Sequence, residues 1–173
     1  LVFMGVSHPD MVFGPTSVVN KLAYGLSEEL GLKDRNVFIL NGWVPYEEID
    51  NYLAEADASV CLGYENIESR FAFRTRYVDL FRARVPLLCT QGDVLANRVH
   101  DAPMGLTVPE RDIDAVVDGI TRLLDDRDFV ATCKANMATM ATELSWDTVV
   151  QPLVDFCVSG ESHATPAGRR RLQ

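Results

Sequence analysis

Short apolar runs alternate along this chain with longer stretches whose apolar residues recur at the period of a helix. The runs fall at residues 1–5, 37–40, 58–62, 86–89 and 104–108. Helical patterns fall near 19–30, 45–56, 74–84, 93–100, 113–124, 127–143 and 146–158. Strands that are apolar throughout and separated by helices are typical of a parallel sheet covered on both faces. We therefore predict an α/β fold with a doubly wound parallel sheet.

Single residues mark the ends of several of these helices. Gly31 is expected to end the first helix, and Pro45 to open the second. Asp93 and Ser145 stand where they can cap the helices that follow them.

Residues 71–88 carry the charged side chains that most restrict which functions this chain can have. Arg74 and Arg76 lie in the first turn of an expected helix, and Asp79 lies one turn further in. Because a helix N-terminus favours anions, two added guanidinium groups predict a phosphate clamp, with Asp79 placed to hold hydroxyl groups beside the phosphate. The alternative is an exposed helix face on which Asp79 pairs with Arg76 or Arg82.

Further candidate residues follow the other strands, because ligands of open α/β sheets bind beyond the carboxyl ends of the strands. They are His8, Gly42, Trp43, Val44, Glu65, Glu68, Gly92 and Asp93. Five of them have a structural alternative: plain loop residues for His8 and the two glutamates, an apolar lid over the core for Trp43, and a helix cap for Asp93.

Composition excludes several classes of function. The formal net charge of -9 argues against a surface for nucleic acid, which needs positive patches. No glycine-spaced dinucleotide fingerprint and no phosphate loop of the Walker type occurs in the sequence. The four cysteines have no ligand spacing, so we expect reduced core residues of a cytoplasmic protein: Cys61, Cys89, Cys133 and Cys157.

The two ends of the sequence differ. It begins within an apolar run, which predicts a fragment of a longer protein. Residues 159–173 are poor in apolar residues and are expected to be a disordered tail. The arginines 169–171 in this tail could contact anionic lipid, although a solvated tail is the simpler interpretation.

Several motifs occur in an order that resembles a known family. They are Leu30-Gly31-Leu32-Lys33-Asp34-Arg35-Asn36-Val37-Phe38, Asn41-Gly42-Trp43-Val44-Pro45, Ala56-Asp57-Ala58-Ser59-Val60, the segment Asp79–Pro86, the segment Gly105–Glu110, and Ser145-Trp146. Together they resemble the C-terminal, donor-binding domain of retaining glycosyltransferases of the GT-B fold, the sucrose-synthase-like group 1 family. The resemblance covers residues 1–158 and implies a Rossmann-like domain, one half of a GT-B enzyme.

The resemblance implies roles for residues near the first helix turn. Asp79 would hold the ribose hydroxyl groups, Arg74 and Arg76 would neutralise the diphosphate, and Ala72 and Phe73 would offer backbone N–H groups to it. The sequence also departs from the family pattern. Phe71 replaces the first glutamate of the paired acidic motif, and Arg74 replaces the glycine that usually follows its aromatic residue.

The resemblance extends to the rest of the donor. Gly42, Trp43 and Val44 would border the base, and Glu68 or Glu65 would hold hydroxyl groups of the transferred sugar. No metal is implied, because cationic side chains carry the diphosphate charge. The acceptor-binding domain, the first strand and the usual phosphate-binding Arg and Lys would lie before Leu1.

The implied reaction is transfer of a hexose from a UDP- or GDP-sugar to a hydroxyl group of a polysaccharide or glycolipid, in the cytoplasm or at the inner face of the membrane. Two alternatives stay open. One is a sugar-nucleotide epimerase of the same build. The other is a noncatalytic nucleotide-binding module, which the substitution at Phe71 favours.

Overall fold

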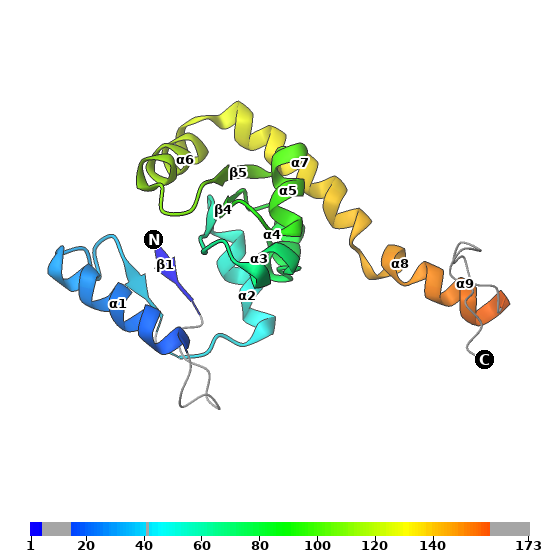
Figure 1. Ribbon diagram of the computed structural model, residues 1–173, viewed down its shortest axis with the longest axis horizontal. Coiled ribbons are helices and arrows are strands. Elements are labelled where there is room, and N and C mark those ends of the chain that lie inside the picture. The colour runs from blue at the N-terminus through cyan, green and yellow to red at the C-terminus, as the bar shows by residue number, and fades with distance from the viewer. Residues whose placement is uncertain (5–14, 41, 160–173) are drawn as a thin grey trace. The chain divides into compact units, whose positions relative to one another are not determined.

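The computed structural model describes residues 1–4, 15–40 and 42–159, with the side chains of 15–20 left out (Figure 1). The chain forms two compact units, Leu1–Tyr52 and Leu53–Gln173, called unit 1 and unit 2 below. His8, Asn41 and the predicted tail beyond Ser159 lie outside the described residues.

Unit 1 contains a small parallel sheet and a helix. Strands β1 (Val2–Phe3) and β2 (Phe38–Ile39) pair in parallel, with Val2 opposite Phe38. Between them lies α1 (Pro15–Glu29), which ends before Gly31 as expected, and Gly31 has a left-handed φ of 65°. Helix α2 (Tyr46–Ala54) follows Pro45 and crosses the division between the units.

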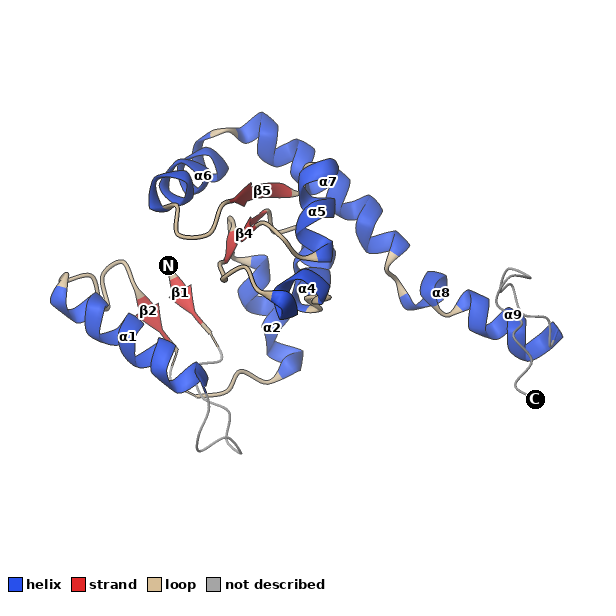
Figure 2. Cartoon of the chain, viewed as in Figure 1, coloured by secondary structure: helices blue, strands red, loops and turns tan. Residues whose placement is uncertain are grey.

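Unit 2 contains a three-stranded parallel sheet in the order β3-β4-β5, of which Figure 2 labels β4 and β5. The strands are β3 (Ser59–Cys61), β4 (Leu87–Thr90) and β5 (Gly105–Val108). The helices around them are α3 (Ile67–Phe71), α4 (Arg76–Ala83), α5 (Val94–Asp101), α6 (Ile113–Asp125) and α7 (Arg127–Glu143). Helices α8 (Trp146–Val149) and α9 (Gln151–Ser159) end the described part.

Helices cover both faces of this sheet. Figure 1 shows α6 on one side of β4 and β5, and α4, α5 and α7 on the other. On the α6 side, Leu88 packs with Val108 and Leu123, and it touches α6 where Gly119 has no side chain. The buried side chains contributed by α4, α5 and α7 include Tyr77, Phe81, Leu95, Val99 and Met137. The predicted doubly wound, parallel α/β architecture is therefore confirmed.

Three local predictions differ from the structure. The segment after β3 contains the short helix α3, where a loop was expected. The expected helix 146–158 is two helices, because Pro152 has no N–H and fits only in the first turn of a new helix. Cys157 is exposed on α9, whereas Cys89 and Cys133 are buried core residues as predicted.

Ser145 precedes α8 as predicted, but its hydroxyl group lies 3.0 Å from that of Thr148 and caps no backbone N–H. None of the helices in the described part of the chain is long and apolar enough to cross a membrane.

Candidate functional site

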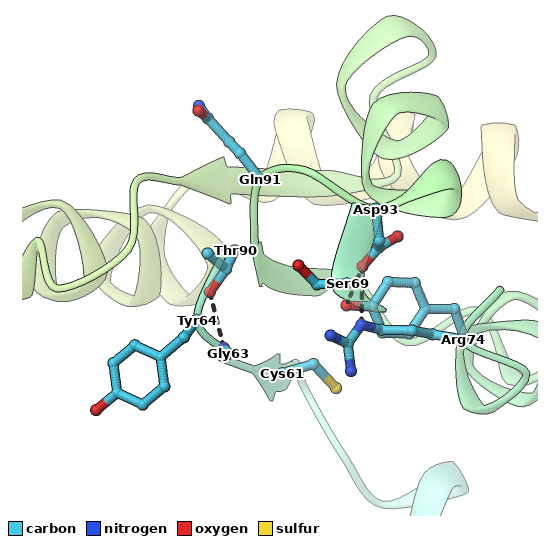
Figure 3. A pocket seen from close by; sticks show the side chains of 9 residues that line it. Cys61, Gly63, Tyr64, Ser69, Arg74, Thr90, Gln91 and Asp93 are labelled. Carbon is cyan, nitrogen blue, oxygen red and sulfur yellow. Dashed lines mark hydrogen bonds and ion pairs between the residues drawn. The ribbon is translucent and has the colours of Figure 1, made fainter. Parts of the chain in front are cut away.

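The carboxyl ends of β3, β4 and β5 meet at one edge of unit 2, where the segments that follow β3 and β4 surround a small hollow (Figure 3). Its lining residues are Cys61, Gly63, Tyr64, Ser69, Arg74, Tyr77, Thr90, Gln91 and Asp93. The hollow holds about 10 Å³, which is room for about one water molecule. A larger ligand would therefore lie across its rim.

Asp93 is the buried centre of this edge, with 3% of its surface exposed. Its Oδ1 accepts hydrogen bonds from the N–H groups of Leu95 (2.9 Å) and Ala96 (2.7 Å), which confirms the predicted cap of α5. Its Oδ2 accepts a bond from Arg74 Nε at 2.9 Å, and the Tyr77 hydroxyl lies 3.5 Å away. A buried carboxylate needs such partners, because its desolvation is costly.

Arg74 is fixed by this ion pair but is still about one-third exposed. Its Nη2 lies near Gly63, and a Cβ added to Gly63 would be 3.5 Å from that nitrogen. Figure 3 shows the guanidinium group at the hollow, with Nε directed to Asp93. Nε is thus used for the internal pair, and the two Nη groups remain on the side from which a ligand could approach.

Arg76 is the first residue of α4 and is exposed. Thr75 precedes it as the N-cap residue without a side-chain bond, and the N–H groups of Tyr77 and Val78 donate to the carbonyls of Arg74 and Thr75. The attraction of this helix end for anions therefore comes from the two arginines and the helix dipole, and not from those two N–H groups.

Asp79 lies one turn into α4 and is partly buried. Arg82 Nη2 is 3.6 Å from Asp79 Oδ1, so the ion pair that we considered as the structural alternative is present. Such helical pairs contribute little to stability, and the contact leaves the predicted role toward ribose open.

The segment between β3 and α4 carries the other candidates. Glu68 is exposed in the first turn of α3, and Phe71 at its end is 82% exposed. The N–H of Ala72, one of the two offered to phosphate by the resemblance, donates to the Ser69 carbonyl at 3.2 Å. Phe73 is 51% exposed beside Arg74.

Gly92 adopts a φ of 110°, which favours glycine, directly before the cap residue Asp93. Gly42, Trp43 and Val44 belong to unit 1, and their role toward the base stays a prediction. Gly42 has a φ of 103°, and Trp43 is 53% exposed.

Sequence reasoning missed three residues of this edge. Thr90 accepts a hydrogen bond from the Gly63 N–H at 3.0 Å (Figure 3), and Ser69 forms a capping box with Asn66. The spacing Asn66-x-x-Ser69 was the signal for the capping box. Tyr77 is 1% exposed, and only its place three residues before Leu80 on an apolar stripe marked it as core.

Two thiols lie side by side in the sheet next to the hollow. Cys61 of β3 is in register with Cys89 of β4. Burial raises the pKa of the Cys61 thiol, and it raises the pKa of the Cys89 thiol to about 12. Both thiols are therefore protonated at neutral pH and are poor nucleophiles. The described residues contain no cluster of acids, histidines and cysteines that could hold a metal ion.

Comparison with solved structures finds the same fold in two other proteins. Sucrose-phosphate synthase from Thermosynechococcus elongatus superposes with a TM-score of 0.71 at 21% identity, over 92% of this chain and 38% of that protein. WaaG, a glycosyltransferase involved in lipopolysaccharide biosynthesis, superposes with a TM-score of 0.61 at 18% identity, over 82% of this chain and 36% of that protein. The chain thus spans less than two-fifths of either structure, and the likeness confirms the Rossmann-like fold expected for one half of a GT-B enzyme.

No curated protein matches the sequence closely. The family model described as "Glycosyl transferases group 1" matches residues 12–126, which include β2 of unit 1 and the whole edge from β3 to β5. The chain belongs to the group 1 family of glycosyl transferases.

Proposed function

We propose that this chain is the nucleotide-sugar donor-binding domain of a glycosyltransferase. The reaction is transfer of a hexose from a UDP- or GDP-sugar to a hydroxyl group of a polysaccharide or glycolipid. The observation that carries the proposal is the pair of arginines at the start of α4, with Arg74 held by buried Asp93 at the ligand-binding edge of the sheet. Membership of the group 1 family supports it.

The arginines take the diphosphate in this proposal. Arg74 presents its Nη groups and Arg76 its exposed guanidinium, so that the charge of the leaving nucleoside diphosphate is stabilised without a metal ion. Because the hollow is small, the diphosphate lies across its rim beside Gly63 and Arg74.

The remaining groups of the donor and the acceptor have proposed partners as well. Asp79 accepts hydrogen bonds from the ribose hydroxyl groups, since a carboxylate can accept two from a vicinal diol. Ala72 and Phe73 flank the phosphates, Glu68 or Glu65 contacts the sugar, and Gly42–Val44 border the base. The acceptor binds to another domain, in the cytoplasm and at the inner face of the membrane when it is a glycolipid.

Nucleotide titration tests the donor site directly. In the full-length protein with EDTA present, calorimetry with UDP, GDP and ADP is expected to show binding of at least one diphosphate. Arg74→Ala and Arg76→Ala are each expected to weaken that binding about tenfold, because charge-assisted hydrogen bonds are lost. The corresponding nucleoside carries no phosphate charge, so its affinity is expected to stay unchanged.

Arg98→Ala is the matched control. Arg98 is an exposed arginine in the last turn of α5, where it pairs with Glu143. Its removal changes the net charge equally but is expected to leave nucleotide affinity unchanged. Diphosphate binding that survives removal of both Arg74 and Arg76 would rule out the clamp.

Activity separates the three candidate functions. Release of UDP or GDP that depends on an acceptor supports transfer, and conversion of the sugar nucleotide without an acceptor supports the epimerase. Binding without either reaction supports the noncatalytic module, which exposed Phe71 at the place of the first acid favours.

A further inference from the structure

Four consecutive residues after β3, Gly63–Asn66, are each anchored by a different neighbour. The Gly63 N–H donates to Thr90 Oγ1 at 3.0 Å, and Asn66 exchanges capping-box bonds with Ser69. These two anchors hold the ends of the segment. We call residues 63–66 the β3 loop.

The two middle anchors come from the loop that follows β5. Glu110 Oε2 accepts a hydrogen bond from the Glu65 N–H at 2.6 Å. The guanidinium carbon of Arg111 lies 5.2 Å from the centre of the Tyr64 ring, within the range of a cation–π contact. Two adjacent residues of the loop after β5 thus contact two adjacent residues of the β3 loop, although 45 positions separate Glu65 from Glu110.

The backbone around Arg111 is built for this arrangement. Arg111 has a left-handed φ of 62°, which is uncommon for a residue with a side chain. On its two sides, Val108 ends a strand in the core and Asp112 caps α6 by accepting from the Ala115 N–H at 2.9 Å. The turn that carries Glu110 and Arg111 is therefore fixed at both ends by regular structure.

Glu65 reaches from the β3 loop to the ligand-binding edge. Gly92 directly precedes Asp93, the partner of Arg74. A Cβ added to Gly92 would lie 3.8 Å from the Cγ of Glu65. The absence of a side chain at Gly92 leaves this space to Glu65. The backbone position of Glu65 therefore decides where its carboxylate stands relative to the arginines.

We infer that Glu110 and Arg111 are positioning residues that set the place of Glu65 for contact with the transferred sugar. The inference rests on the proposed function and extends it to the sugar. Glu110 and Arg111 are exposed, so their contacts contribute little to the core and act mainly on the position of the β3 loop. Neither residue touches the donor in this assignment; both act through the β3 loop.

Two measurements on the full-length protein test the inference. The first is amide hydrogen exchange of the β3 loop, which is expected to rise about tenfold in Glu110→Ala, because an N–H bond to a carboxylate is lost. The second compares the affinity for the UDP- or GDP-sugar with that for the bare diphosphate. Glu110→Ala is expected to weaken binding of the sugar nucleotide about fivefold to tenfold and to leave diphosphate binding unchanged.

Matched variants separate position from charge and from folding. Glu110→Gln keeps an oxygen acceptor and is expected to restore both measurements close to wild type. Asp114→Ala removes an acid from the first turn of α6 and is expected to change neither. Arg111→Ala is expected to follow Glu110→Ala in direction, and all variants should keep the thermal midpoint of the wild type.

Each contrary result has a distinct meaning. Unchanged exchange of the β3 loop in Glu110→Ala overturns the anchor. Faster exchange with an unchanged preference between sugar nucleotide and diphosphate overturns the role toward the sugar, while the proposed donor site stands. Failure of the wild-type protein to bind any diphosphate overturns the proposed function, and the role toward the sugar with it.

Discussion

At the scale of single residues, Asp93 links the start of a helix to the orientation of a cation. One carboxylate oxygen accepts from two backbone N–H groups of α5, and the other accepts from Arg74. Asp93→Ala removes both functions. We expect a loss of about 2–3 kcal/mol in the free energy of unfolding, measured by urea denaturation, because the cap contributes about 1 kcal/mol and the charged bonds add to it.

Asp93→Asn distinguishes the two functions of this side chain. Asparagine is as good a cap as aspartate, but it carries no charge to hold Arg74. We expect Asn to recover at least half of the lost stability while diphosphate affinity still falls, because Arg74 is no longer oriented. Equal stability of the Ala and Asn variants would show that the cap contributes little.

Asp79 offers a test of binding against stability. Its visible ion pair with Arg82 is at 3.6 Å on a helix surface, and such pairs contribute about 0.3–0.5 kcal/mol. Bonds from a carboxylate to a bound diol contribute about 1.5–3 kcal/mol each. Asp79→Ala is therefore expected to weaken nucleotide binding in calorimetry at least tenfold with little change in the urea midpoint. Identical binding by mutant and wild type would assign Asp79 to the ion pair alone.

At the scale of elements, the central strand β4 leaves no room at Gly105 of its neighbour β5. A Cβ there would lie 1.8 Å from the Leu87 carbonyl oxygen, and the φ of Gly105 is 157°. Because Leu87 is buried in the middle of the sheet, its backbone cannot move aside. We expect Gly105→Ala to destabilise unit 2 by more than about 4 kcal/mol, measured by urea denaturation.

Gly25→Ala is the opposite case and serves as the control. Gly25 lies inside α1, and an added Cβ would meet nothing within 4 Å. Alanine is favoured over glycine within a helix by about 1 kcal/mol, so this variant is expected to be neutral or stabilising. A Gly105→Ala protein as stable as Gly25→Ala would contradict the close approach of β4 and β5.

The elements that could be predicted from the sequence are those with a core to fill. The runs at 58–62, 86–89 and 104–108 are strands because their side chains are apolar on both faces of the sheet. Helix α3 could not be found in this way, since Ser69 is its only buried residue and its start depends on the capping box with Asn66. The prediction of one helix over 146–158 overlooked Pro152, which marks the break between α8 and α9.

The candidate site was predictable in its location but not in its contacts. The end of β4 and the start of α4 follow from the strand and helix pattern, and this places Arg74 and Asp93 at one edge. Their ion pair joins residues 19 positions apart, and the bond from Glu65 to Glu110 spans 45. Such pairings depend on how the loops close over the sheet, which no local pattern encodes.

At the scale of the whole molecule, buried thiols are expected to lower stability at alkaline pH. Burial raises the pKa of Cys89 to about 12 and that of Cys133 to about 11, from ordinary values of 9. Below about pH 9 these thiols are protonated in both states and have no effect. As the pH rises from 9 toward the folded-state pKa values, the unfolded chain ionises first, so stability falls by up to about 1.4 kcal/mol per pH unit for each thiol.

Urea denaturation with reductant between about pH 8 and 10.5 measures this slope. Cys89→Ala is expected to lower stability at every pH but to flatten the slope above pH 9. Cys157 is exposed on α9, and Cys157→Ala is expected to leave the slope as in wild type. A wild-type slope that Cys89→Ala does not change would mean that the Cys89 thiol ionises equally in both states.

The two units differ in the fraction of their side chains that is buried. This difference predicts two levels of local stability. Among the described side chains of unit 1, only Ser27 is buried, and Leu22, Leu26 and Leu30 of the α1 stripe are more than half exposed. In unit 2, all residues of β4 are buried. Backbone hydrogen bonds open at a free energy set by the packing around them, so those of β2 should open far more often than those of β4.

Native-state hydrogen exchange with mass spectrometry measures both levels in one experiment. Peptides that cover residues 37–40 are expected to exchange about a hundredfold or more faster than peptides that cover 87–90, although both contain parallel-strand bonds near 3 Å. Peptides from α9, where every side chain is exposed, give the fast reference within the same chain. Equal protection of β2 and β4 would show that unit 1 opens only together with the core of unit 2, and it would contradict the independence that the burial pattern predicts.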